Sequence, residues 1–567
     1  MARWLSGTTS EQRQAFLQLM QHLRRGDAVA AAATAAAAAA ATASDAPRYS
    51  NAILSVRDVA AIPRAPDQTG MPHNAPATSL EAVVGRIRFD RSDVLGRGST
   101  GTMVYIGSYM GKRAAIKVVA PLDSDSSMGF GTVSDHEPAD CKPDRARIAT
   151  REVELLNMCE NEHSHPNVLR LFGWEEDVSS NIVYLALEMC AASLDDLVRD
   201  SMQPAQCSSR RRALLAKVGL LPPPLSQISL PPQLRRIFGE MLSAIAHLHR
   251  LGILHCKLRP RSVLVNSNGV LKLSGLGLGR LVQSGFVPMR ADSRQGARDA
   301  IASEGFDPPE VIQSLQITGC TDSQPSFSPE LKHSVDAFAA AVLLFWMLTG
   351  ARHPFSDDAT RRTANIISGE PMQLALIHPF PEARDLIAAM LRADPRERLR
   401  AHQAIEHPCL WPDERKLWFI RCVADEPSLV ESCAFSQELE QLAPAIFSDG
   451  DWTSRLHAEL VEALQAHRSY RKDSVRDLLR AIRNSDHMQG MSEQVQRLLL
   501  PRPLGIALYF LPRFPSLFWT LYTLVRHHWR EKSVFEPFFE WETLALHQRE
   551  GSGLSIGSAG GLRLPPA

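Results

Sequence analysis

The chain has 567 residues, and its 62 basic and 62 acidic side chains cancel, so any site for nucleic acid must rest on local charge. Hydrophobic residues make up 44% of the chain, which is enough for a sizeable core in three or four domains. Nine cysteines are scattered and form no C-x-x-C pair. This usage predicts neither a disulfide framework nor a zinc site and is typical of a reduced, intracellular protein.

The first 85 residues are rich in Ala, Pro, Ser and Thr, and we predict that they are disordered. Within them, an uncharged, alanine-dominated run covers residues 28–44. Alanine is weakly apolar, and the run is shorter than the ~20 residues that a spanning helix needs. The composition therefore favours a low-complexity linker over a membrane anchor. Residues 546–567 are rich in Gly, Ser and Pro and predict a flexible tail.

Between these two terminal segments, the sequence predicts ordered strands and helices. Residues 94–119 alternate apolar residues and glycines, as in a twisted antiparallel sheet, and residues 182–188 predict a further strand. A helix is predicted to begin at residues 151–156, another has apolar spacing over 234–248, and 338–348 predict a buried helix. Residues 204–232 form a basic, proline-rich insertion, and after Trp411 the pattern is almost wholly helical to about Phe539.

A glycine-rich element precedes a strand lysine near the start of the organised region. In a kinase amino lobe, such glycines let backbone N–H groups cover phosphates, and the lysine is held by a helix glutamate. Lys117, in Ala115-Ile116-Lys117, is the candidate lysine; its expected partner is Glu152, with Glu154 as the alternative. The candidate nucleotide-binding glycines are Gly96, Gly98 and Gly101.

The segment from His255 to Leu264 resembles a kinase catalytic loop but departs from it at the residues that carry the chemistry. Lys257 stands where the catalytic aspartate belongs, and an ammonium cannot accept a substrate proton. Ser262 replaces a metal-binding asparagine, and Gly275 replaces the aspartate that holds magnesium. Phosphoryl transfer depends on these groups, so the sequence predicts a kinase fold without kinase activity and without a metal site.

Features that serve the kinase fold rather than its chemistry are kept. Pro308-Pro309-Glu310 resembles the A-P-E element, and Arg398 is placed like the arginine that pairs with its glutamate. Asp336 is expected to head the apolar helix that follows. We therefore predict a two-lobed α+β protein-kinase fold.

A basic window lies in the helical carboxy-terminal part. Residues 467–484 contain six basic and two acidic side chains, a net charge of +4. Ser474, with Asp477 three residues later, predicts a capping-box start of a helix. In that helix Arg476, Arg480 and Arg483 share one face, opposite apolar residues.

Three further polar residues flank the arginine stripe. Tyr470 precedes the predicted helix, and Asn484 and His487 end it. Guanidinium groups beside a phenol, an amide and an imidazole suit a phosphodiester. The alternative is an ordinary amphipathic helix whose arginine face is solvated.

Both halves together, residues 87–539, resemble the inositol-requiring enzyme family of unfolded-protein-response sensors and its relative RNase L. The matching stretches are Arg151-Glu152-Val153, His165-Pro166-Asn167-Val168, Glu188-Met189-Cys190-Ala191-Ala192-Ser193-Leu194, Ala246-His247-Leu248-His249, Asp451-Trp452, the segment from Ser474 to Asn484, Arg513-Phe514-Pro515 and Phe535-Glu536-Pro537-Phe538. The resemblance implies a pseudokinase domain over residues 86–412, followed by an all-α kinase-extension nuclease domain over residues 413–545.

In this family RNA is cleaved without a metal, because the ribose 2′-OH attacks its own phosphate. By motif position, Tyr470 would assist deprotonation of that hydroxyl, and Arg483 and Asn484 would hold the phosphate as charge builds. His487 would protonate the leaving oxygen. The family's histidine lies four residues after the asparagine, where this chain has Met488; a one-residue deletion would restore His487 to the role.

The resemblance also implies ligands and partners. ATP or ADP would act as a regulatory ligand with little or no magnesium, and Glu188 and Cys190 would join the nucleotide site. The nuclease would need no cofactor. Expected partners are an RNA substrate with a stem-loop, a second copy of the chain in a homodimer or higher oligomer, and a membrane-bound relative. The expected location is the cytoplasm or the cytosolic face of the endoplasmic reticulum.

The leading hypothesis from the sequence is therefore a metal-independent endoribonuclease, controlled by dimerisation and by nucleotide binding to a pseudokinase, in RNA processing of the unfolded-protein-response type. Two alternatives stay open. One is a catalytically inactive dimerisation scaffold, and the other is a Ser/Thr protein kinase with unusual catalytic residues.

Overall fold

The computed structural model describes residues 81–97, 102–120, 145–161, 164–180, 182–221, 224–226, 229–276, 280–281, 305–317, 329–429, 434–486 and 492–542. These residues belong to one compact unit, Thr78–Ala567. The predicted tail, most of the predicted disordered segment, Gly98, Gly101 and His487 lie outside the described residues.

A six-stranded antiparallel sheet forms the amino-terminal lobe, with the strand order β1-β2-β3-β4-β6-β5. Its strands are β1 (Glu81–Val84), β2 (Ile87–Arg97), β3 (Met103–Tyr109), β4 (Lys112–Val119), β5 (Leu171–Asp177) and β6 (Ile182–Leu187). The predicted antiparallel sheet is thus confirmed. The boundary at residue 85 needs correction, because β1 pairs with β2, and Ala82 and Val84 pack against Phe89 and its neighbours.

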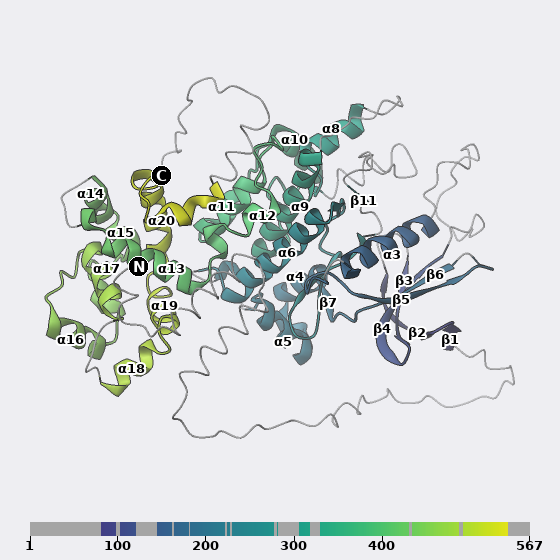
Figure 1. Ribbon diagram of the computed structural model, residues 1–567, viewed down its shortest axis with the longest axis horizontal. Helices are drawn as coiled ribbons and strands as arrows, with labels where there is room; N and C mark the ends of the chain where they lie inside the picture. The colour runs from purple at the N-terminus through teal and green to yellow at the C-terminus, as the bar shows by residue number, and fades with distance from the viewer. Residues whose placement is uncertain are drawn as a thin grey trace. The chain divides into compact units, whose positions relative to one another are not determined.

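One helix, α3 (Arg145–Asn161), lies against strands β4, β5 and β6 of this sheet (Figure 1). It begins six residues before the predicted start at Arg151. Val153 and Leu156 of α3 are buried in the same hydrophobic cluster as Leu185 of β6. This packing fixes the position of the helix over the strand that carries Lys117.

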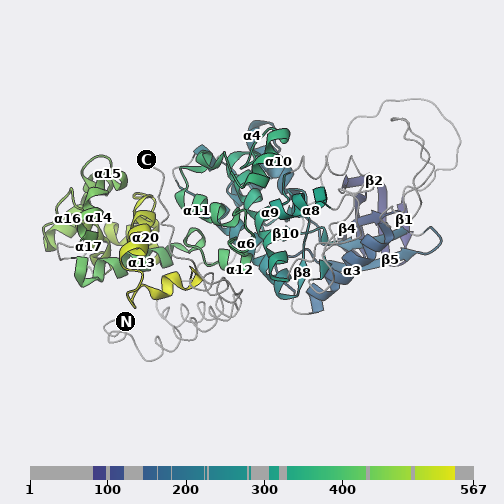
Figure 2. The same ribbon diagram turned by 90° about the horizontal axis from the view of Figure 1, so that it is seen from above.

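The second lobe is mainly helical and is built around α6 (Pro232–Arg250) and α9 (Pro329–Thr349), which pack side by side (Figure 2). The predicted buried helix over residues 338–348 is confirmed, since every side chain in it is buried. Asp336 does not head this helix, because α9 starts at Pro329 and Asp336 lies inside it. The other α-helices described in this lobe are α4 (Leu194–Met202), α5 (Ser209–Val218), α8 (Pro309–Ile317), α10 (Ala359–Ser368), α11 (Pro381–Met390) and α12 (Ala401–Ala404).

The basic, proline-rich insertion contains a helix of its own. Ser208 caps the start of α5, and Gly219 ends it in a left-handed conformation with φ +79°. Leu214 and Leu215 are buried in the main core of the lobe. The insertion is therefore part of the folded lobe.

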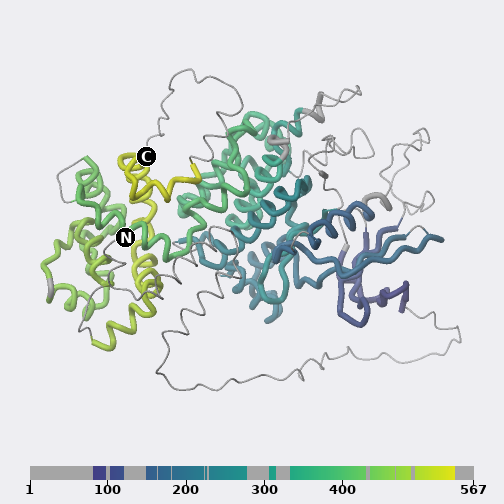
Figure 3. The backbone as a smooth tube through the Cα atoms, in the orientation of Figure 1, coloured from purple at the N-terminus to yellow at the C-terminus, as the bar shows by residue number. Residues whose placement is uncertain are grey.

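The carboxy-terminal domain is all-helical among its described residues, as predicted. Its helices include α13 (Asp413–Asp425), α14 (Ala434–Gln441), α15 (Ala443–Ile446), α16 (Ala458–His467), α17 (Val475–Asn484), α18 (Glu493–Leu499), α19 (Leu504–Phe510) and α20 (Leu517–His528). They enclose a separate hydrophobic core rich in aromatic rings. The first helix of this domain, α13, drawn in green in Figure 3, packs against α20, drawn in yellow.

The kinase-like lobe and the helical domain share contacts. The ring of Trp541 belongs to the hydrophobic core of the kinase-like lobe and meets the ring of His407 edge to face, with 5.0 Å between centroids. Arg235 forms an ion pair of 2.7 Å with Asp413 at the start of α13. Among the described helices, none is both long and apolar enough to cross a lipid bilayer.

Candidate functional site

The strand lysine and the helix glutamate of the kinase-like lobe meet. Lys117 Nζ lies 2.5 Å from Glu152 Oε2, and Glu152 is only 2% exposed. Glu154 is instead exposed and pairs with Arg151. The partner of Lys117 is therefore Glu152 and not the alternative, Glu154, and this is the pair that a kinase amino lobe uses to hold its lysine.

The other expected nucleotide-site residues are only partly described. Gly96 lies in β2, where open space surrounds the position that a Cβ would take. The Glu188 carboxylate is engaged by Lys272 of strand β10 (Leu271–Leu273) at 2.8 Å, a partner that sequence reasoning missed. Burial raises the pKa of the Cys190 thiol to about 12, so this side chain is neutral at physiological pH.

The catalytic-loop region keeps its structural hydrogen bonds. His255 is fully buried; its backbone N–H donates to Asp336 at 2.9 Å, and its Nε2 donates to the carbonyl of Ser274 at 2.9 Å. Arg398 forms the predicted ion pair with Glu310, at 2.8 Å, which confirms that reading of the sequence. These bonds tie the loop, α8 and α9 together whether or not the lobe transfers phosphate.

At the positions where a working kinase holds magnesium, this chain has Ser262 and Gly275, which provide no carboxylate. Ser262 Oγ is committed to the backbone: it accepts from Arg259 N and donates to Arg259 O, both at 2.9 Å. Gly275 has no side chain and a φ of +82°, where an L-residue is strained. Within the described part of the chain, no group of three or more His, Cys, Asp or Glu could hold a metal ion.

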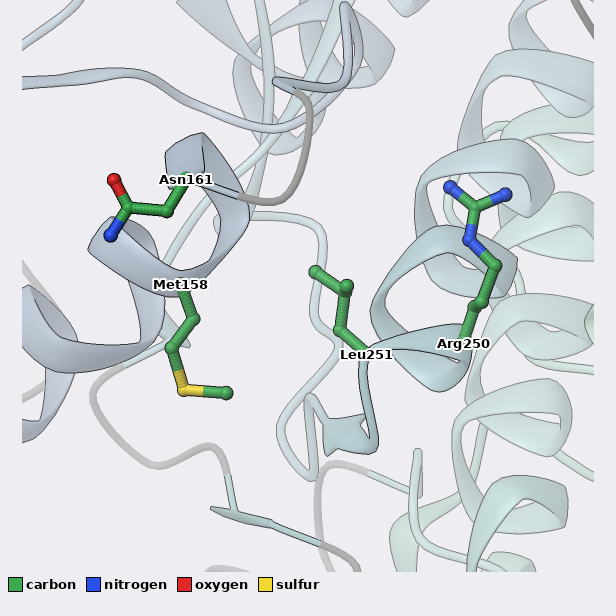
Figure 4. Close-up of a pocket in the computed structure, with 4 residues that line it drawn as sticks. All are labelled: Met158, Asn161, Arg250 and Leu251. Carbon is green, nitrogen blue, oxygen red and sulfur yellow. The ribbon is translucent and has the colours of Figure 1, made fainter.

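A cavity of about 390 Å³ lies between the ends of α3 and α6, lined by Met158, Asn161, Arg250 and Leu251 (Figure 4). Its one charged group is already used, because Arg250 Nη2 donates to His247 Nδ1 at 2.9 Å. With two apolar residues, an amide and an engaged cation, the cavity offers no acid, base or nucleophile. We assign it no chemical role.

In the helical domain, α17 carries the basic stripe, and its start is fixed by two carboxylates. Ser474 caps the helix as predicted by accepting from Asp477 N at 3.3 Å. The predicted reciprocal bond of a capping box is replaced, because Asp477 Oδ2 accepts from Arg471 N at 2.7 Å. Glu440 of α14, which the sequence did not point to, accepts from Ser474 Oγ at 2.7 Å and from Val475 N at 2.9 Å.

The arginines of α17 have different surroundings. Arg476 is held by Glu440 at 3.0 Å and Arg480 by Asp477 at 2.9 Å, so these two stabilise the domain. Arg483 Nη1 donates to Ala424 O at 3.2 Å, and its Asp425 partner, at 3.3 Å, is 65% exposed. The stripe is therefore neither simply solvated nor wholly free for a ligand, because all three arginines are partly exposed and each has a carboxylate partner.

Tyr470, Asn484 and Arg483 form a connected cluster at the end of α17. The Asn484 amide donates to the Tyr470 phenol oxygen at 2.8 Å, and Arg483 Nε donates to Asn484 Oδ1 at 3.2 Å. Trp452 holds Tyr470 from the side, with ring centroids 6.2 Å apart in an edge-on contact. A hydroxyl, an amide and a guanidinium therefore converge, as a site for a phosphodiester requires.

Comparison with known proteins matches the two parts of the chain to two families. Residues 89–410 match the protein kinase domain family, and residues 416–539 match the family named ribonuclease 2-5A. The human serine/threonine-protein kinase/endoribonuclease IRE2 is 31% identical over 486 residues, which are 84% of this chain and 45% of the relative. The chain belongs to the inositol-requiring kinase/endoribonuclease family. It combines the kinase-type fold with the kinase-extension nuclease domain.

Other members of the family are similar over the same region. The serine/threonine-protein kinase/endoribonuclease IRE1a of Arabidopsis thaliana is 29% identical over 490 residues, 81% of this chain and 51% of the relative. The sensor for unfolded proteins in the ER of Schizosaccharomyces pombe is 26% identical over 519 residues, 87% of this chain and 43% of the relative. The chain thus spans about half the length of the curated relatives that it matches.

Proposed function

We propose that this chain is a metal-independent endoribonuclease, with its active site at the end of α17. The observation that carries the proposal is the hydrogen-bonded cluster of Tyr470, Asn484 and Arg483 on a cationic helix. Its groups are donors fixed by packing, and donors aimed at developing charge usually provide the largest catalytic contribution. The match to the ribonuclease 2-5A family supports the same conclusion.

The proposed reaction uses the RNA's own nucleophile. The ribose 2′-oxygen bonds to the neighbouring phosphorus while Tyr470 assists removal of its proton, which passes to solvent water. The bond from phosphorus to the 5′-oxygen breaks, and His487, placed by sequence alone, gives that oxygen its proton. Arg483 and Asn484 hold the phosphate as negative charge builds. Products are a 2′,3′-cyclic phosphate and a 5′-hydroxyl, and the need for a 2′-OH restricts the substrate to RNA.

Cleavage of a stem-loop RNA by the full chain in excess chelator tests this proposal. We expect Tyr470→Phe and His487→Ala each to slow cleavage by roughly 10²-fold or more, the usual scale for a lost acid–base group. Tyr509→Phe is the matched control, because Tyr509 is also buried but its hydroxyl bonds to His457 outside the cluster. Intact RNA at concentrations that favour dimers would instead support the inactive scaffold.

We further propose that the kinase-like lobe is a pseudokinase that senses ATP or ADP. The Lys117–Glu152 pair supports nucleotide binding, while Lys257, Ser262 and Gly275 do not suit magnesium or proton transfer. ADP should therefore raise the Tm equally with magnesium or with chelator, and Lys117→Ala should abolish the effect. Transfer of labelled phosphate from ATP to protein, lost in that variant, would support the Ser/Thr kinase alternative.

The proposals on oligomeric state, RNA substrate and location rest on similarity to the related proteins. Nucleotide in the pseudokinase would favour a homodimer or higher oligomer, and pairing would activate cleavage. The substrate would be a stem-loop RNA in processing of the unfolded-protein-response type. The proposed location is the cytoplasm or the cytosolic face of the endoplasmic reticulum, with a membrane-bound relative as a further partner. Sedimentation of the full chain with and without ADP would test the oligomeric part.

A further inference from the structure

Two arginines from different elements converge on one acidic residue just beyond the Tyr470 cluster. Arg421 of α13 places its Nη1 3.0 Å from Asp486 Oδ2. Arg502, before α19, donates from Nη1 to the carbonyl oxygen of Asp486 at 2.6 Å. Both arginines therefore meet at the turn that ends α17.

These bonds leave a specific part of each guanidinium unused. Nε and Nη2 of Arg421, and Nε of Arg502, are buried and have no hydrogen-bond partner among the described residues. Nε and Nη2 of one arginine point the same way and form the edge that grips two oxygens of a phosphate or carboxylate. Buried polar groups in native proteins nearly always have partners, so a vacant edge points to a ligand.

The vacant edge lies beside the proposed active site but is separate from it. Arg421 and Asp425 are one turn apart on α13 and so share a face of that helix. Asp425 is the partner of Arg483, while Asp486 follows Asn484 by two residues. Since α13 packs directly against α17, the Arg421 edge and the Arg483 cluster are neighbours.

The local charge favours an anion. Arg421, Arg483 and Arg502 face two carboxylates, those of Asp425 and Asp486, so one positive charge remains uncompensated. Burial lowers the pKa of Arg421 and Asp486 opposes this, but a guanidinium stays charged in proteins at neutral pH. Arg421 keeps 19% of its side-chain surface exposed, but its Nε and Nη2 are buried, so a phosphate reaches this edge only when neighbouring side chains move aside.

We propose that Arg421 and Arg502 form a second phosphate subsite, which binds a backbone phosphate next to the one that is cleaved. This inference rests on the proposed nuclease function and extends it to the substrate's flanking nucleotide. Two phosphates held at once would fix the RNA backbone in register with Tyr470 and Asn484. The subsite contributes to RNA binding and not to the chemical step. Its loss should therefore change KM and the salt dependence of KM, and leave kcat unchanged.

The first test uses Arg421→Lys, which keeps the charge and loses the two-pronged edge. We expect KM for the stem-loop RNA to rise about tenfold, kcat to stay within about twofold, and the slope of log KM against log salt to stay unchanged. Arg421→Gln also removes the charge and should lower that slope by roughly 0.7, the value for one phosphate contact to a single strand. Arg497→Gln is the matched control for the loss of charge, since Arg497 is an exposed arginine of the same domain. An unchanged KM in Arg421→Lys, or an unchanged slope in Arg421→Gln, would overturn the proposal.

The second test does not depend on a variant's fold. A single neutral methylphosphonate is moved through the positions that flank the cleavage site in substrates for the wild-type chain. One flanking position should raise KM about tenfold, and that position should have no further effect in Arg421→Lys. Additive effects would overturn the subsite. A wild-type chain that cleaves no RNA would instead contradict the nuclease, and binding of a 2′-deoxy-substituted RNA would then still test the subsite.

Discussion

The Asn484 side-chain amide donates a hydrogen bond of 2.8 Å to the phenol oxygen of Tyr470, which lies fourteen residues earlier and outside α17. This bond fixes the amide's orientation and leaves Asn484 Oδ1 to accept from Arg483. The Asn484 amide thus links the Tyr470 phenol to the Arg483 guanidinium. Replacing Asn484 should therefore disturb the positions of both Tyr470 and Arg483.

Asn484→Asp should therefore impair cleavage strongly while leaving the fold intact. The substitution keeps the shape, removes the donor to Tyr470 and adds a negative charge where phosphate charge develops. We expect kcat to fall by about 10² to 10³-fold, the range for losing one fixed donor. Single-turnover cleavage and thermal unfolding, measured together, check this. A kcat within threefold of wild type would contradict the role of Asn484.

Glu440→Gln should weaken both stability and cleavage. Glu440 accepts from Ser474 Oγ, from Val475 N and from Arg476, so it organises the start of α17. Losing its charge should cost about 1–3 kcal/mol of unfolding free energy. Glu438→Gln is the control, because Glu438 lies two residues away and pairs with His528 at the surface. Equal stability of the two variants in urea unfolding would refute this assignment.

Arg398→Ala should be among the most destabilising substitutions in the kinase-like lobe. The Arg398 side chain is fully buried and binds both Glu310 and the carbonyl of Ser334. Removing it leaves a buried carboxylate unpaired, at a cost of about 3–5 kcal/mol. In contrast, Arg86→Ala breaks an ion pair whose arginine is 59% exposed and screened by solvent, so it should lower the Tm far less than Arg398→Ala does. Thermal unfolding of both variants makes the comparison.

The stability of the kinase-like lobe should fall in mild acid. Burial lowers the pKa of His353 to about 3 and that of His165 to about 4. A histidine in the unfolded chain binds its proton near pH 6.5, so the unfolded state binds more protons. The contribution to stability is therefore full above about pH 6.5 and is lost as pH falls toward the folded pKa.

His353→Gln should reduce this acid sensitivity. Each extra proton bound on unfolding contributes about 1.4 kcal/mol per pH unit, so below pH 6 the variant's stability should fall less steeply than that of wild type. Glutamine still offers a donor for the carbonyl of Gly305, which His353 Nε2 reaches at 2.9 Å. His378→Gln, at an exposed position, is the control. Parallel stability curves for His353→Gln and wild type from pH 7 to 4 would contradict the prediction.

The sequence could predict those structural elements that depend on residues close together in the chain. The apolar run over 338–348 predicted a buried helix, and Ser474 predicted the start of α17, because helical periodicity and capping act within a few residues. The kinase-like fold and the Glu310–Arg398 pair followed from motif resemblance. By contrast, no sequence pattern pointed to Glu440, Lys272 or Asp425 as ion-pair partners. Each meets its partner across 34 or more residues of chain, and only packing brings them together.

The placement of Trp541 in the core of the kinase-like lobe links the fates of the two domains. A deletion that unfolds the lobe would also strip this ring of its packing partners and expose the end of the helical domain. The helical domain therefore depends on the kinase-like lobe for the packing of its end, whether or not that lobe transfers phosphate.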